Sequence, residues 1–124
     1  MKTDSTPGRR FYERQIELLE AGDVDRLIDE QYRKDATLVG FDVLVKGSDA
    51  LREHFREYLD HLGGLEVLST DKFTETEDSI FFEATVLSKL GEAKVYDVFL
   101  LRDGRISHHF TGVTSVVPLR AQEA

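Results

Sequence analysis

The sequence contains no cysteine and no asparagine, and its two prolines lie near the ends, at Pro7 and Pro118. Without cysteine there is no disulfide, no thiolate nucleophile and no thiolate metal site. Without asparagine there is no acceptor for N-glycosylation. No apolar run approaches the length that crosses a membrane, and the first residues lack the apolar core of a secretion signal. We therefore expect a cytoplasmic domain that does not associate with membranes.

Basic residues are also fewer than acidic ones. The chain has 16 Lys and Arg against 24 Asp and Glu, a net charge of −8 at pH 7. A surface of this sign repels nucleic acid and anionic lipid, so neither is an expected partner. With 124 residues, 40% hydrophobic and 32% charged, the chain has the size and composition of one globular domain. We expect a single domain over residues 1–124, with loose tails at about residues 1–6 and 119–124.

Apolar residues at helical spacing predict three helices in the first half of the chain. The first begins near Pro7 and ends before Gly22, and the second covers about Val24–Tyr32. Ser48 is predicted to cap the third, which Gly63 and Gly64 end. His54 and His61 share one side of this third helix. The pattern predicts that side to be solvated, and no metal is expected there.

Gln15 interrupts the apolar stripe of the first helix. Two interpretations stay open: a boundary residue that bonds to water, or a polar group that points into a pocket. Tyr12, on the same helix, and Tyr58, on the third, are predicted to line such a pocket, where their hydroxyls could bind a polar ligand atom.

After Gly64 the apolar pattern changes to a period of two. Strands are predicted at 65–74, 79–90 and 95–101, followed after the Asp103-Gly104 turn by a last strand that Pro118 ends, with short connections that make an antiparallel meander. Shorter strands are predicted at 35–39 and 43–45. Helices followed by a meander indicate an α+β fold, in which a strongly curved, mostly antiparallel sheet encloses a cavity with the three helices.

Asp97 is the one charged residue within the apolar strand Val95–Leu101. A carboxylate in such surroundings needs a hydrogen bond, a partner charge or a proton. The next strand carries His108 and His109 side by side, and side chains alternate along a strand, so one of them shares the face of Asp97. Asp97 is then either a general acid or base, or the group that orients the imidazole. The alternative interpretation gives Asp97 a structural role only, as a buried carboxyl that is hydrogen-bonded to a hydroxyl, a backbone group or water.

The turn at Asp103-Gly104 determines which histidine faces Asp97. A two-residue turn places Asp97 opposite Phe110, so that Ile106, His108 and Phe110 share its face; this register gives the more apolar face and is preferred. A turn with a bulge at Gly104 places Asp97 opposite His109, with Thr111 and Val113 on the same face. The candidate catalytic residues are Asp97, His108 and His109. The candidate ligand-binding residues are Gln15, Tyr12, Tyr58, Phe99 and Phe110.

Four segments resemble the NTF2-like fold, in its SnoaL-like and ketosteroid-isomerase-like branch. They are AGDVDRLI, DATLVG, KGSDALREHF and YDVFLLRDGRI, and the resemblance covers about Arg9 to Val117. It implies a cone of helices on a curved sheet around a cavity. The fold hosts isomerases, polyketide cyclases and non-catalytic dimerisation domains, so it does not fix the activity.

The ketosteroid-isomerase pattern matches this sequence in part. That family holds an oxyanion with a protonated Asp at the position of Asp97, which the resemblance carries over. Its tyrosine corresponds to Gln15 and its general-base Asp to Gly40, and Asp42 could replace that base only in a remodelled loop. SnoaL-like cyclases are closer, because they also pair an Asp with a His inside the cavity.

These observations predict a pocket for a small hydrophobic molecule and leave two functions open. The first is an isomerase or cyclase that moves protons next to a carbonyl, with Asp97 and a histidine and without metal or organic cofactor. The second is a non-catalytic ligand-binding or dimerisation module. A homodimer is expected through the outer face of the sheet, where Tyr96, Val98 and Leu100 are too apolar for water.

Overall fold

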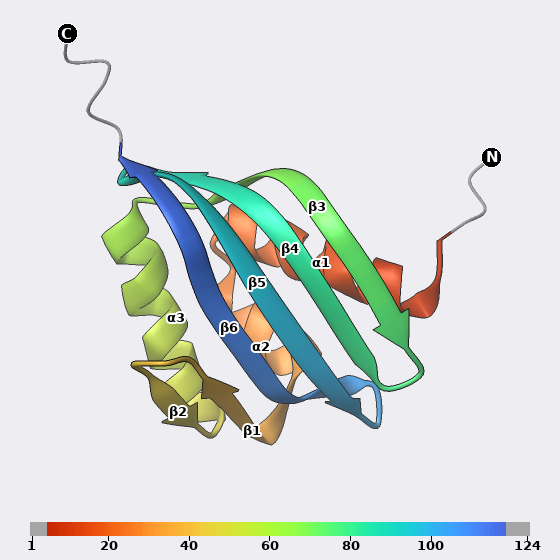
Figure 1. Ribbon diagram of the computed structural model, residues 1–124. Helices are drawn as coiled ribbons and strands as arrows, with labels where there is room; N and C mark the ends of the chain where they lie inside the picture. The colour runs from red at the N-terminus through yellow and green to blue at the C-terminus, as the bar shows by residue number, and fades with distance from the viewer. Residues whose placement is uncertain (1–4, 119–124) are drawn as a thin grey trace, which may run out of the picture.

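The computed structural model describes residues 5–118, which form three helices packed on a six-stranded sheet (Figure 1). The helices are α1 (Pro7–Ala21), α2 (Val24–Gln31) and α3 (Ser48–Leu62). The strands are β1 (Tyr32–Val39), β2 (Leu44–Lys46), β3 (Glu66–Thr76), β4 (Ser79–Ser88), β5 (Gly91–Arg102) and β6 (Arg105–Pro118). The predicted α+β class is confirmed. Of the predicted tails at about 1–6 and 119–124, residues 1–4 and 119–124 lie outside the described residues.

The sheet has the order β2-β1-β6-β5-β4-β3, and only the β1–β6 pair is parallel. Strands β3 to β6 form the predicted meander, and they bend around the helices as a curved layer (Figure 1). Helix α1 packs against β3 and β4, whereas α3 packs against β1 and β2. The helices therefore cover the concave face, and the convex face carries no helix within residues 5–118.

Local sequence explains where the helices begin and end. The Thr6 hydroxyl accepts a hydrogen bond from the Arg9 amide at the start of α1, and Asp23 accepts one from the Arg26 amide at the start of α2. Gly22 and Gly63, both with left-handed backbone, end α1 and α3. The predicted cap of α3 is wrong by one position, because Ser48 is already helical and Gly47 precedes it.

The β5–β6 hairpin differs from both predicted registers. Arg102 pairs with Arg105 across a two-residue turn, in which Asp103 and Gly104 both have positive φ, as this turn type requires. The pairing then shifts, because Leu101 faces Ile106 while Leu100 faces His108. The extra residue is Ser107, whose hydroxyl donates to the Leu100 carbonyl.

This bulge at Ser107 reverses the alternation of β6 relative to the preferred register. Asp97 therefore lies opposite Thr111, not Phe110, and Phe99 lies opposite His109. His109 takes the concave side of the strand and His108 the convex side.

The core lies between the helices and the concave face. Its largest fully buried side chains are Tyr12, Tyr32, Phe99, Leu27, Ile28, Leu38, Leu51, Ile80, Ile106 and Gln15. Two of these are tyrosines and one is an amide, so the core has a polar region. No helix within residues 5–118 is long and apolar enough to cross a membrane.

Candidate functional site

A cavity of about 510 Å³ lies between the helices and the concave face of the sheet. Helix α1 contributes Tyr12 and Gln15, and α3 contributes His54, Phe55 and Tyr58. The sheet contributes apolar side chains from β3 to β6 together with Asp97, His109 and Thr111. The cavity is thus apolar over most of its wall, with a few polar groups that converge, which is typical of a small-molecule site.

Asp97 and His109 form a close pair in the wall of this cavity. His109 Nε2 lies 2.7 Å from Asp97 Oδ1, and both side chains are buried. The ring of Phe99 meets the His109 ring edge-on, at 4.8 Å between centroids, and restricts the imidazole. The β5–β6 pairing positions all three, because Phe99 and His109 are directly opposite and Asp97 lies two residues before Phe99 on the same face of β5.

Behind His109, a chain of hydrogen bonds runs back into helices α1 and α2. His109 Nδ1 lies 2.8 Å from the Tyr32 hydroxyl, which receives the Gln15 amide N–H at 2.9 Å. Gln31 Nε2 donates to Gln15 Oε1 at 3.2 Å and to the Phe11 carbonyl at 3.0 Å. The chain therefore links α1, the end of α2, the first residue of β1, and β6.

The direction of every bond follows from one backbone group. The Phe11 carbonyl can only accept, so the Gln31 amide nitrogen faces it and also donates to Gln15. Gln15 then presents its own N–H to Tyr32, whose single proton is left for His109 Nδ1. His109 keeps its proton on Nε2 and donates it to Asp97 Oδ1.

The other tautomer of His109, with its proton on Nδ1, would leave a buried group without a hydrogen-bond partner. A proton on His109 Nδ1 would have to go to Tyr32, which already accepts from Gln15, and the Tyr32 proton would then have no acceptor. The network therefore favours the tautomer of His109 with its proton on Nε2, and its donors are directed in sequence toward Asp97.

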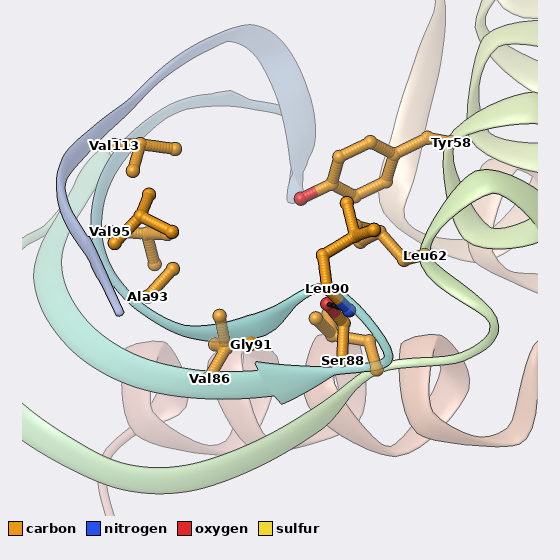
Figure 2. Close-up of a pocket in the computed structure, with 11 residues that line it drawn as sticks. Tyr58, Leu62, Val86, Ser88, Leu90, Gly91, Ala93, Val95 and Val113 are labelled. Atoms are coloured by element: carbon orange, nitrogen blue, oxygen red, sulfur yellow. Dashed lines mark hydrogen bonds between the residues drawn. The ribbon is translucent and has the colours of Figure 1, made fainter. Parts of the chain in front are cut away.

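The second carboxylate oxygen is open to the cavity. Among residues 5–118 no hydrogen bond reaches Asp97 Oδ2, and none of their fully enclosed side-chain polar atoms lacks a partner, so Oδ2 borders the open space. Tyr58, on α3, points its hydroxyl toward the sheet (Figure 2), and that hydroxyl also makes no bond to the described residues. An acceptor and a donor thus face the same apolar space.

Burial keeps the cavity tyrosines protonated. It is the main cause that raises the pKa of Tyr12, Tyr32 and Tyr58, and the charge of Asp97 raises each of them further. At neutral pH these hydroxyls are therefore hydrogen-bond donors. Tyr12 uses its hydroxyl on Thr70, 2.5 Å away, which leaves Tyr58 as the free one.

Most of the expected pocket residues line the cavity, and two do not. Gln15, Tyr12, Tyr58 and Phe99 are in the wall with Asp97 and His109. Gln15 is almost completely buried and bonded, which excludes the boundary residue that bonds to water. The preferred placement of His108 and Phe110 is wrong: the bulge at Ser107 moves both to the convex face, where their rings stack.

Sequence reasoning missed Tyr32, Gln31 and His54. Tyr32 was expected to end α2 but begins β1, so its ring enters the core beside His109. A tyrosine and a glutamine at the junction of two elements are ordinary in sequence, and no signal marks them. His54 was expected on a solvated side of α3, but it is half-buried, lines the cavity and stacks on Tyr58.

Asp42 and Phe41 lie in the β1–β2 loop at the cavity and are exposed. Gly40, just before them, has no room for a side chain, because an added Cβ would lie 2.8 Å from Val43.

Within residues 5–118 no cluster of three or more His, Asp or Glu could hold a metal ion.

Comparisons with known proteins identify the family and the fold of this chain. The family model of the SnoaL-like domain matches residues 9–109. An NTF2-like protein from Anabaena variabilis has a TM-score of 0.77 at 19% identity, over 93% of this chain and 95% of that one. A comparison with curated proteins finds no match.

Two further structures carry descriptions of an activity. A candidate isomerase of the SnoaL-like family from Agrobacterium tumefaciens has a TM-score of 0.75 at 14% identity, over 88% of this chain and 98% of that one. A candidate polyketide cyclase from Sinorhizobium meliloti has a TM-score of 0.74 at 15% identity, over 83% and 94%. At these identities the likeness is one of fold. The chain therefore belongs to the SnoaL-like domain family, and its fold is that of the NTF2-like protein from Anabaena variabilis.

Proposed function

We propose that this domain is an acid–base catalyst of the isomerase or cyclase type, acting on a small, largely apolar carbonyl compound. The observation that carries the proposal is the buried Asp97–His109 pair, 2.7 Å apart, with Asp97 Oδ2 open to an apolar cavity. The neighbours described as a candidate isomerase of the SnoaL-like family and as a candidate polyketide cyclase support the same class.

In this proposal Asp97 is the general base. Oδ2 takes a proton from the carbon next to the substrate carbonyl, and the electron pair of that C–H bond moves onto the carbonyl oxygen. The Tyr58 hydroxyl donates a hydrogen bond to the resulting enolate oxygen. Return of the proton from Asp97 to another carbon of the conjugated enolate completes an isomerisation. In a cyclisation, the enolate carbon attacks a second carbonyl of the same molecule, and Asp97 returns its proton to the alkoxide that forms.

His109 and the residues behind it position the base. Its Nε2–H holds Oδ1 in place, so that Oδ2 alone faces the substrate. Tyr32 and Gln15 keep the imidazole in the tautomer that donates to Asp97. His109 therefore acts through Asp97, as a positioning residue.

The test is the exchange of ketone α-protons for deuterium in D₂O, followed by NMR for simple ketones with and without the protein. We expect the protein to accelerate exchange, and Asp97→Asn to reduce that acceleration about 100-fold or more, the usual contribution of a general base. His109→Gln is expected to reduce it less.

The matched control is His108→Gln, because it removes a histidine next to His109 in sequence but outside the cavity. Its exchange rate should equal that of the unmodified protein. An Asp97→Asn protein that exchanges at the full rate would refute the catalytic role and leave a non-catalytic binding module.

We also propose that the convex face of the sheet forms a homodimer. Phe81 and Leu100 are 46% and 38% exposed there, beside the half-buried Tyr96, Val98 and Phe110. The Tyr96 ring lies directly against Gly112, where an added Cβ would be 2.5 Å from it, so the aromatic surface continues across β6. An apolar patch that spans several strands is typical of a contact between subunits.

A further inference from the structure

A second, smaller cavity of about 190 Å³ opens beside the main one, and we call it the side pocket. It lies between the end of α3, the β4–β5 turn and the concave side of β5 and β6 (Figure 2). Its wall shares five residues with the main cavity: Tyr58, Leu65, Val86, Val95 and Val113. The side pocket therefore borders the space that contains Asp97.

The side pocket differs from the main cavity in chemistry. It contains no charged side chain, and its remaining wall consists of Leu62, Leu90, Ala93 and Val116, with Gly91 and Ser88. The Ser88 hydroxyl oxygen already accepts a hydrogen bond from the Leu90 amide, at 3.1 Å. Apart from the hydroxyls of Ser88 and of Tyr58, which the side pocket shares with the main cavity, the wall thus offers a ligand only apolar contact.

Several apolar side chains of this wall are unusually exposed. Leu90 is 46% exposed, Val113 59% and Val116 57%. Leu90 lies in the β4–β5 turn, and Val113 and Val116 lie on β6. Val113 faces Tyr58 of α3 across the side pocket (Figure 2). A hydrocarbon group between the two walls would remove apolar surface from water on both sides.

The volume sets the size of that group. An engineered apolar cavity of about 150 Å³ in another protein accommodates benzene. The side pocket, at about 190 Å³, therefore has room for a hydrocarbon of about six carbons.

We propose that the ligand of this domain is an elongated amphipathic molecule. Its polar head lies in the main cavity at Asp97, and a hydrocarbon tail of about six carbons or more lies in the side pocket. The position of the head rests on the proposed function, whereas the tail site rests on the side pocket alone.

The test is a homologous series of straight-chain 2-alkanones, from 2-butanone to 2-dodecanone. Their dissociation constants are measured by NMR titration of methyl groups in the full-length protein. Each methylene that reaches the side pocket should lower the dissociation constant about fourfold, the ratio that corresponds to burying one CH₂ group. The dissociation constant should stop falling with chain length, and the gain in affinity should end, once the tail fills the side pocket.

Two variants block the side pocket. Ala93→Phe fills it from β5, and Val116→Phe fills it from the more exposed end of β6, where a larger side chain disturbs the fold less. In both variants, each added methylene should no longer lower the dissociation constant of the longer ketones. Glu92→Phe is the matched control, because it puts the same ring on the opposite, exposed side of β5 and should keep the gain.

The proposal is overturned if the longer ketones bind no better than 2-butanone, or if both blocking variants keep the full gain. The outcome is separable from that of the proposed function. If Asp97→Asn exchanges α-protons at the full rate while the chain-length gain persists, the catalytic proposal fails and the tail site stands.

Discussion

On the concave face of the sheet, β5 and β6 present Asp97 and His109, which are buried, whereas on the convex face they present Val98, Leu100 and Phe110. Phe81 of β4 joins the convex set and is 46% exposed. Soluble domains ordinarily bury apolar groups and expose polar ones. In this sheet both departures occur on the same two strands.

Both departures cost stability in the isolated chain, since a buried carboxylate loses hydration and an exposed aromatic ring orders water. The hydrogen-bonded chain from Gln31 to His109 offsets the first cost. Contact with a second subunit would offset the second cost, because it would remove the exposed apolar side chains from water. The comparison therefore separates the face proposed for catalysis from the face proposed for assembly, and each of the following experiments tests one side of it.

Truncation of a ring on each face should have very different effects on folding. Phe99→Ala removes a side chain that is 1% exposed and touches the rings of Phe11, Phe82 and His109. We expect it to lower the free energy of unfolding by about 3–5 kcal/mol. Leu100→Ala, one residue along on the convex face, should lower it far less. Urea denaturation of dilute protein measures both, and equal losses would contradict the contrast between the faces.

Loss of the Tyr32 hydroxyl should have the next largest effect. Tyr32→Phe leaves both Gln15 Nε2 and His109 Nδ1 without their partner. We expect the free energy of unfolding to fall by about 1–3 kcal/mol, the cost of an unsatisfied buried polar group. The ¹⁵N shifts of His109 should move away from those of a pure Nε2–H tautomer. Tyr96→Phe, on the convex face, is the control and should change neither quantity.

A charge on the convex patch should weaken the proposed dimer. Leu100→Glu places a carboxylate among apolar side chains, and we expect the dissociation constant to rise at least tenfold, equivalent to about 1.4 kcal/mol. Sedimentation velocity over a dilution series measures this change. Leu44→Glu alters another exposed leucine, on β2 outside the patch, and should leave the association unchanged. A monomer at all concentrations of the unmodified protein would refute the interface.

The smallest effect concerns pH and His54. Burial beside the cavity lowers the pKa of His54 from its ordinary value near 6.5, so the folded state favours the neutral ring. Its contribution to stability is complete above about pH 6.5 and is lost as the pH falls through the lower pKa of the folded protein. His54→Gln should therefore lose less stability between pH 8 and pH 5 than the unmodified protein. His61→Gln, at an exposed position, should lose as much as the unmodified protein.

The elements of this fold were largely predictable because their signals are local. Apolar spacing, the caps at Thr6 and Asp23, and the Asp103-Gly104 turn specify the helices and the hairpin within a few residues of sequence. The pocket position of Gln15 was one of two open interpretations. The proximity of Asp97 to one of the two histidines could be predicted, because side chains alternate between the two faces along adjacent strands.

The histidine itself could not be chosen, because the bulge at Ser107 decides it. A single serine hydroxyl on the Leu100 carbonyl leaves no pattern in sequence, yet it moves His108 outward and His109 inward. Tyr32 and Gln31 were missed for a related reason. Their roles depend on β1 lying beside β6, a parallel contact between distant segments that periodicity does not report.

That parallel contact also sets when the site can form during folding. The bond between Tyr32 and His109 joins residues 77 positions apart, whereas the strands of the meander pair with their sequence neighbours. Contacts across long stretches of chain close slowly, since the entropy of the intervening loop is lost before the contact is gained. We therefore expect the meander to form early and the Asp97–His109–Tyr32 arrangement to be completed only when β1 docks on β6. A ligand that requires this arrangement should then bind the native state alone, and its release during unfolding would report the separation of these two strands.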